Sequence, residues 1–200
     1  MAIITSLDAL RAGEVLRGAA IAMRAFDAPA TVRATSDEVL YILEGDEGIH
    51  LPAGTEISIG ASTVVIGVRA GFSRPSRGGP HSVRLSDQPI QRTGDRWYRE
   101  LIQSEITQFV GSIPPGRAPD HFHLYEEVLC ILMGSGFLWA DGKRTPVGPG
   151  SCVYLPKRQV HCLENSGSDE LRLLGVFYPA GSPAVRYGVD ENADGRPRRG

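Results

Sequence analysis

Two histidines and two glutamates stand directly ahead of an apolar run in residues 120–136, which read DHFHLYEEVLCILMGSG. Side chains alternate between the two faces of a strand, so His121, His123 and Glu127 share one face while Glu126 points to the other. Two imidazoles and a carboxylate are costly to bury unless they are paired or bound to a cation. Three donors of this kind suit a metal ion, whereas a hydrogen-bonded surface pair of histidines is the reading that H-x-H alone would favour.

A second segment, residues 150–165 (GSCVYLPKRQVHCLEN), adds a histidine that enters a further strand. With this segment the chain resembles the cupin superfamily. The residues that match the two motifs of that family are, in order, His121, His123, Glu127 and Gly134, and then Gly150, Pro156, His161 and Asn165. The sequence departs from the motifs in two turns, where Pro115 and then Gly116 stand at the leading glycine of the first motif and Arg158 replaces a glycine of the second.

The resemblance implies a small antiparallel barrel that binds one divalent metal ion per chain. Its ligands would be His121, His123, Glu127 and His161, with positions left over for water and substrate. Imidazole and carboxylate donors fit Fe, Mn, Ni, Zn or Cu and do not choose among them. Cys162 has the opposite parity to His161, so we leave it out of the ligand set.

The elements that must position these residues are short strands. Twenty-four glycines and 14 prolines divide the chain into segments rich in Val, Ile, Leu and Tyr, which is typical of an all-β sandwich or barrel. Only residues 6–12 (SLDALRA) resemble a helix, with Ser6 as a possible N-cap. We therefore predict an all-β fold.

An internal repeat indicates two copies of one β unit. Residues 38–45 read EVLYILEG and residues 127–134 read EVLCILMG, identical at six of eight positions. The resemblance makes these copies two tandem cupin (jelly-roll) barrels. Aligning the copies puts Val32 and Ala34 where the first two histidines stand, so the N-terminal barrel is predicted to lack metal ligands.

Composition divides the chain further. A segment rich in Arg, Ser, Gly and Pro lacks strand periodicity and is predicted to be a linker. The predicted organisation is a degenerate cupin-like barrel at 1–72, a linker at 73–96, a metal-binding cupin barrel at 97–188 and a flexible tail at 189–200. Both faces of each repeat strand are apolar, so each strand should pack on its own barrel and on either the other half or another chain. Because bicupins and cupin dimers pack this way, the resemblance supports a homodimer.

Charge and cysteine content narrow the partners and the compartment. A formal net charge of -2 with scattered basic residues gives no footprint for nucleic acid or an anionic membrane. The N-terminus has no basic leader, and no apolar run approaches the length of a membrane span. Three cysteines in apolar sequence, Cys130, Cys152 and Cys162, are interpreted as buried thiols in a reducing compartment. We expect a cytoplasmic protein with a small-molecule partner.

The chemistry is predicted to be that of a metal-dependent enzyme. Leu129, Ile131 and Met133 share the parity of the ligands, and Phe137 and Trp139 follow, which suggests an apolar pocket for an aromatic or enolic substrate. This favours a dioxygenase-like oxidoreductase. A Zn-type Lewis-acid isomerase, cyclase or decarboxylase and a non-catalytic binding or sensing module remain alternatives. The candidate acid–base residues are Gln159, Tyr125 and Tyr154, and the loop residue His81 is a candidate lid residue.

Overall fold

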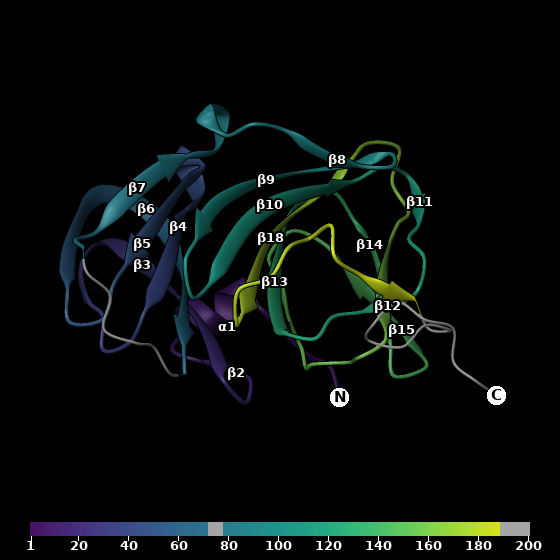
Figure 1. Ribbon diagram of the computed structural model, residues 1–200, viewed down its shortest axis with the longest axis horizontal. Coiled ribbons are helices and arrows are strands. Elements are labelled where there is room, and N and C mark those ends of the chain that lie inside the picture. The colour runs from purple at the N-terminus through teal and green to yellow at the C-terminus, as the bar shows by residue number, and fades with distance from the viewer. Residues whose placement is uncertain (72–77, 189–200) are drawn as a thin grey trace.

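The computed structural model describes residues 1–71 and 78–188, and their regular secondary structure consists almost entirely of strands arranged in three sheets (Figure 1). The all-β prediction is therefore confirmed. The helical elements are short: α1 (Leu7–Arg11) and the 3-10 turns η1 (Leu43–Gly45) and η2 (Leu85–Asp87). Ser6 caps α1, because its Oγ accepts a 3.1 Å hydrogen bond from the backbone N–H of Ala9. No helix in the described ranges is long and apolar enough to cross a membrane.

The N-terminal half forms one bent six-stranded antiparallel sheet. Its strand order is β2 (Leu16–Arg17), β3 (Ile21–Arg33), β6 (Glu56–Ala70), β4 (Glu38–Ile42), β5 (Glu47–Leu51) and β7 (His81–Arg84). The long strands β3 and β6 pair along their length with a register shift between Ala28 and Ala30, and such irregularities bend a sheet. The N-terminal core is small and includes Val32, Ala34, Leu40, Ile42, Leu51, Ile59 and Val65.

The C-terminal half is built from two sheets that face each other (Figure 1). The first has the order β1 (Ile3–Ser6), β16 (Ser151–Leu155), β13 (Glu126–Met133), β18 (Leu171–Tyr178), β10 (Thr107–Ile113), β9 (Arg96–Gln103) and β8 (Gln91–Thr93). The second has the order β15 (Lys143–Val147), β14 (Gly136–Ala140), β17 (His161–Asn165), β12 (His121–Phe122) and β19 (Tyr187–Gly188), with β11 (Gly116–Arg117) also on β17. Side chains from both sheets form the core of this barrel.

The repeat strands are buried on both faces, and the second face packs on the other half of the same chain. On β13, Leu129 and Ile131 lie in the C-terminal barrel core, whereas Val128 and Cys130 lie in a core shared by both halves. Strand β4 alternates in the same way between the N-terminal core and the shared core. Each fully buried aliphatic side chain stabilises the fold by roughly 1.5–3 kcal/mol. The shared core therefore explains the double burial without a second chain, and the homodimer stays a prediction.

Two segments lie elsewhere than the sequence suggested. The range predicted as a linker, 73–96, contains β7, which pairs with β5, and β8, which pairs with β9. Both are short edge strands, and β7 is largely exposed, so neither needs apolar alternation to form its backbone ladder. Strand β1, placed in the N-terminal unit, pairs instead with β16 of the C-terminal half. The predicted tail, 189–200, lies outside the described residues.

Candidate metal centre

Three histidines meet at one end of the C-terminal barrel. His121 lies on β12 directly opposite His161, the first residue of β17, and His123 follows β12 in the chain. Their ring centroids are 4.5 to 5.6 Å apart. One potential ligand atom from each ring lies within 4.8 Å of the others, so the cluster could hold a metal ion. The structure thus brings together the three histidines that the sequence predicted.

Glu127 points at the same place from β13, which belongs to the other sheet of the barrel. The prediction that one strand carries His121, His123 and Glu127 on a single face is therefore wrong, because the chain passes from one sheet to the other between β12 and β13. Its Oε2 lies 3.5 Å from Nε2 of His161 and 3.8 Å from Nε2 of His123, and its side chain is only 8% exposed. Among the described residues, this buried oxygen has ion-pair contacts but no hydrogen-bond partner. A buried carboxylate oxygen without a hydrogen bond is costly unless a cation is close by. The donor set and this orphaned oxygen therefore fit a divalent metal ion.

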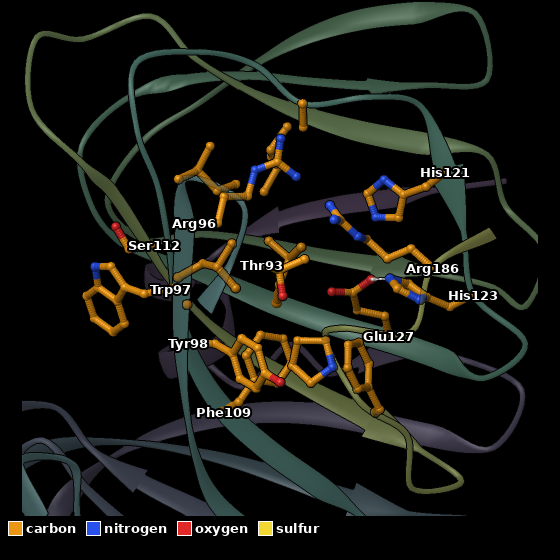
Figure 2. A pocket seen from close by; sticks show the side chains of 18 of the residues that line it. Thr93, Arg96, Trp97, Tyr98, Phe109, Ser112, His121, His123, Glu127 and Arg186 are labelled. Carbon is orange, nitrogen blue, oxygen red and sulfur yellow. Dashed lines mark ion pairs between the residues drawn. The ribbon is translucent and has the colours of Figure 1, made fainter. Parts of the chain in front are cut away.

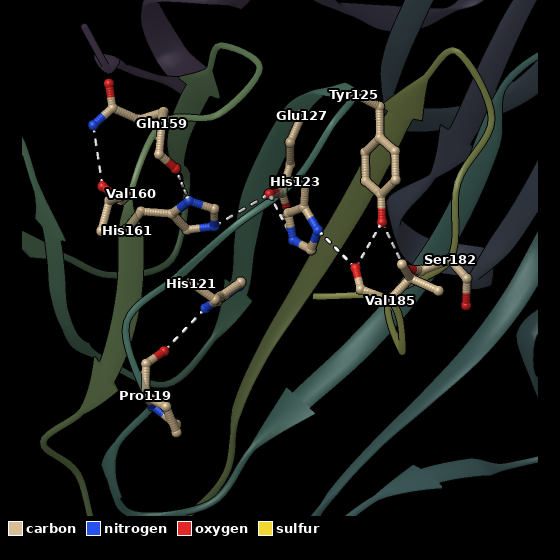
Figure 3. Close-up of polar contacts among 10 residues, drawn as sticks. All are labelled: Pro119, His121, His123, Tyr125, Glu127, Gln159, Val160, His161, Ser182 and Val185. Carbon is tan, nitrogen blue, oxygen red and sulfur yellow. Dashed lines mark hydrogen bonds and ion pairs between the residues drawn. The ribbon is translucent and has the colours of Figure 1, made fainter. Parts of the chain in front are cut away.

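Each histidine is oriented by a backbone carbonyl behind it (Figure 3). The Nδ1 atoms donate to carbonyl oxygens as follows: His121 to Pro119 at 3.0 Å, His123 to Val185 at 3.0 Å and His161 to Gln159 at 2.8 Å. Because a carbonyl can only accept, each Nδ1 carries the proton and each Nε2 keeps its lone pair. Such outer hydrogen bonds fix the tautomer and orientation of metal-binding histidines.

The electrostatics of the four side chains suit a bound cation. Burial, followed by the proximity of His161, lowers the pKa of His121 to about 2. Burial is also the main reason that the pKa of His123 is lowered. Burial opposes ionisation of Glu127, but His161 and His123 outweigh it and the pKa of the carboxyl is lowered. Neutral imidazoles beside an ionised carboxylate are the protonation states that ligate metals.

A pocket opens beside this cluster and is walled by both C-terminal sheets (Figure 2). Its apolar lining includes Phe109, Ile113, Leu129, Leu163, Leu173 and Phe177. Two cationic side chains, Arg96 of β9 and Arg186, also line it. Sequence reasoning missed both arginines. Arg96 was assigned to the linker and Arg186 belongs to no motif, so no local signal could have found either one.

The segment that carries Arg186 crosses the pocket after β18. Its Ser182 and Val185 carbonyls accept hydrogen bonds of 2.7 and 3.1 Å from the Tyr125 hydroxyl. The Val185 carbonyl is also the partner of His123. We call residues 180–188 the C-terminal strap. The strap contacts the histidine cluster in two ways. It ends in β19, which pairs with β12, the strand of His121, and its Val185 carbonyl accepts the hydrogen bond of His123.

The three candidate acid–base residues do not line the pocket. Tyr125 stacks on His123 with ring centroids 4.9 Å apart, and its hydroxyl donates a hydrogen bond to the Ser182 carbonyl of the strap. The Tyr154 hydroxyl accepts a 3.3 Å hydrogen bond from the backbone N–H of Ala19, in the N-terminal half. Gln159 is part of an exposed turn, where its side chain donates to the Val160 carbonyl. The hydrogen bonds of these three side chains are therefore made outside the pocket, which strand parity alone does not show.

Glu126 faces away from the cluster, as predicted, and it is buried against the N-terminal half. It is 3% exposed, and its two oxygens accept hydrogen bonds of 3.1 and 3.0 Å from the backbone N–H of Ala20. Ala20 lies just before β3 in the N-terminal half. Glu126 and Glu127, adjacent in sequence, thus serve different parts of the molecule: one joins the two halves and the other faces the metal cluster.

Parity holds for part of the predicted apolar pocket and fails for the rest. Leu129 lines the pocket and Ile131 lies in the same core, but Met133 is 42% exposed because the register shifts between Ile131 and Met133. Phe137 and Trp139 lie on the outer face of β14, where both rings meet the guanidinium of Arg144. Trp139 Nε1 also donates to Glu164.

The structure also places Arg158, Cys162 and His81, three residues that the sequence analysis singled out. Arg158 adopts a φ of +62°, the conformation that explains a glycine in the family motif, and its N–H donates to the His123 carbonyl at 2.7 Å. Cys162 is buried, like the other two cysteines, and burial with a hydrogen bond to Asp120 raises its pKa to about 12. It is therefore a protonated thiol. His81 lies on β7 of the N-terminal sheet, opposite His50, and does not line the pocket.

Comparison with known proteins agrees with this architecture. The cupin domain family matches residues 109–177. Among solved structures, oxalate decarboxylase of Bacillus subtilis superposes with a TM-score of 0.67 and 13% identity over 94% of this chain and 75% of that chain, which shows the fold of both halves. Residues 109–177 thus match the cupin domain family, and the chain as a whole shares the fold of oxalate decarboxylase.

Curated relatives match over shorter stretches. An uncharacterized protein of Methanocaldococcus jannaschii is 35% identical over 54 residues, which are 27% of this chain and 43% of that protein. An oxalate-binding protein of Thermotoga maritima is 33% identical over 67 residues, 32% of this chain and 55% of that protein. The matched stretches thus span about half the length of these relatives.

Proposed function

We propose that the protein is a metal-dependent cupin in which His121, His123, Glu127 and His161 hold one divalent transition metal ion. The observation that carries the proposal is the orphaned Oε2 of Glu127, buried and facing imidazoles whose Nε2 lone pairs are held ready by their Nδ1 hydrogen bonds. Among the described residues the only cluster of three suitable donors is the histidine triad of the C-terminal half.

The chain contributes orientation and exclusion of water to the chemistry. The bound metal would supply a Lewis acid or redox centre next to the pocket. The backbone carbonyls of Pro119, Gln159 and Val185 hold the imidazoles in place. Apolar side chains such as Leu129 and Phe177 keep the wall behind the cluster dry, which strengthens electrostatic interactions in the site.

The pocket favours a dioxygenase-like reaction over isomerisation or cyclisation. Among the described lining residues, Glu127 is the only carboxylate. The hydroxyls of Tyr98 and Ser112 are already donated to Gln91 and Glu170. A reaction that needs a general base apart from the metal ligands to move a substrate proton therefore lacks one. For a dioxygenase reaction, a bound redox metal would supply the oxygen chemistry, and Glu127 is the one lining carboxylate that could take up a substrate proton.

A second candidate, a non-catalytic binding module, is favoured by the same lack of acid–base groups. One of the curated relatives carries the name oxalate-binding protein. In that case the metal and the pocket would retain a small molecule without converting it. The two candidates share one site and differ in turnover only.

Elemental analysis and turnover test the proposal together. Protein purified without nickel affinity or chelator should contain about one metal ion per chain, and His121→Ala should lose it. His81→Ala removes an exposed histidine of the N-terminal sheet and should retain the metal. Oxygen consumption is then measured with flavonols, β-diketones and 2-oxo acids. Consumption that depends on His121 supports the enzyme, binding without consumption supports the module, and metal-free wild type refutes both.

A further inference from the structure

Two guanidinium groups share the pocket with the metal cluster. Arg96 comes from β9 in the first sheet of the barrel and Arg186 comes from the C-terminal strap. Figure 2 shows both side chains reaching inward, with Arg186 directed between His121 and Glu127 toward the middle of the pocket. Burial, and after it the charge of Arg96, lowers the pKa of Arg186.

Neither arginine has a buried carboxylate to neutralise it. Within residues 1–71 and 78–188, Arg186 forms no ion pair, and the ion pair of Arg96 is a 4.0 Å contact between its Nε and the exposed Asp95. The side chain of Arg96 is 19% exposed and its Nε has no hydrogen-bond partner among the described residues. Elsewhere in the described chain, Arg24 and Arg144 each meet a glutamate within 3.2 Å. Among the described residues, Arg96 is thus left with an unsatisfied Nε donor and Arg186 without an ion pair.

The charge of the filled site follows from these groups. Among the described lining residues, Glu127 provides the only negative charge, against two guanidinium groups and the divalent metal ion that the site would hold. A net positive pocket with low-dielectric walls attracts and orients anions. Guanidinium forks bind carboxylates through two parallel hydrogen bonds, which gives geometric selectivity as well as affinity.

We propose that Arg96 and Arg186 form the carboxylate-binding end of the pocket, and that the ligand is a carboxylate with a neighbouring oxygen for the metal and an apolar body. This inference rests on the proposed metal centre and specifies its substrate class, of which aromatic 2-oxo acids are examples. The apolar body is required because Phe109, Leu163 and Leu173 line the same pocket and offer no polar group.

A matched pair of probes isolates the carboxylate. Benzoylformate is an aromatic 2-oxo acid, and its methyl ester keeps the shape and the oxo group but loses the charge. Isothermal titration of the metal-loaded full chain should show that the acid binds at least tenfold more tightly than the ester. Arg186→Gln and Arg96→Gln should each weaken acid binding by about tenfold to a hundredfold and leave ester binding unchanged. Arg186→Lys, which keeps the charge but not the fork, should fall between.

The control is Arg33→Gln, which removes an exposed arginine of the N-terminal sheet that pairs with Glu56. It should change neither affinity. Equal binding of acid and ester, no binding of the acid, or full acid affinity in both pocket variants overturns the inference. Loss of ester and acid binding together does so too, because it would mean a collapsed site. If oxalate bound more tightly than benzoylformate, the claim that the ligand has an apolar body would be wrong.

Metal content measured on the same samples separates this inference from the proposed function. Metal-free wild type refutes the metal centre. In that case an acid preference that disappears in Arg186→Gln still upholds the arginine end. A normal metal content without any acid preference refutes only the arginine end.

Discussion

The two halves of the chain carry the same glutamate on the same strand and neutralise it differently. In the C-terminal half, Glu127 faces three imidazoles and its Oε2 has no hydrogen bond among the described residues. In the N-terminal half, Glu38 is 2% exposed and its Oε1 accepts hydrogen bonds of 3.0 and 2.8 Å from Arg24. Apolar Val32 and Ala34, both buried, stand where the first two histidines are in the other copy.

The difference teaches what a repeat preserves. A carboxylate buried in a small barrel needs a positive partner, and an internal arginine meets that need as well as a metal does. The N-terminal copy keeps the packing of the strand on the shared core. The side chain of Arg24 takes the place next to the glutamate that a bound metal ion would have in the C-terminal copy. Metal removal should therefore affect one half, and loss of an arginine the other.

Metal removal should have the largest effect. A ligand that binds only the folded state stabilises it by about 4 kcal/mol at a thousandfold excess over its dissociation constant. We expect EDTA to lower the unfolding temperature of wild type strongly and that of His121→Ala very little. Calorimetry with and without chelator measures both. If EDTA left the unfolding temperature of wild type unchanged, no bound metal ion would stabilise the C-terminal half.

Glu127→Gln comes next. It keeps the size of the side chain and removes the negative charge, so metal affinity should fall by about a hundredfold, or ~3 kcal/mol. In the presence of chelator the variant should be at least as stable as wild type, because no unpaired carboxylate remains buried. Metal competition assays and denaturation with chelator test the two parts separately.

The adjacent Glu126→Gln is the matched control. It weakens the hydrogen bonds to the N–H of Ala20, which should lower stability by about 1 kcal/mol with or without chelator. Metal content should not change. If this variant lost the metal and Glu127→Gln kept it, the assignment of the two faces of β13 would be wrong.

Arg24→Met tests the N-terminal half. It leaves Glu38 buried without its partner, and we expect a loss of about 2 kcal/mol, moderated because the Arg24 side chain is 43% exposed. The response to chelator should match that of wild type. Urea denaturation measures the loss, and a double variant with Glu38→Met should recover most of it. Arg33→Met, which breaks an exposed pair, should cost well under 1 kcal/mol.

Tyr125→Phe should have the smallest effect. It removes the hydroxyl that donates to Ser182 and Val185 and so loosens the strap behind His123. Outer contacts of this kind change metal affinity by tenfold or more when they act directly on a ligand. Here the action is one step removed, so we expect a change of a few fold. Unchanged affinity would show that the strap does not position His123.

The cluster of three histidines and Glu127 is the part of the site that could be predicted from the sequence. The spacing of His121, His123 and Glu127 and the motif around His161 predicted that these four side chains meet. Strand parity is not the reason, because His121 lies on β12 and Glu127 on β13, which belong to different sheets. Short-range periodicity also predicted the all-β fold and the double burial of the repeat strands. The prediction that Met133 points into the pocket is wrong, because a register shift, which parity does not predict, turns it outward.

Only the tertiary structure decided which distant segments meet. Strand β1 crosses to the C-terminal half, the predicted linker adds edge strands, and the second face of β13 packs on the same chain. Arg96 and Arg186 are 90 residues apart and converge on one pocket. Local sequence encodes which face a side chain takes, because alternation is a property of the backbone. It does not encode what lies opposite that face, because strand pairing depends on the packing of the whole chain.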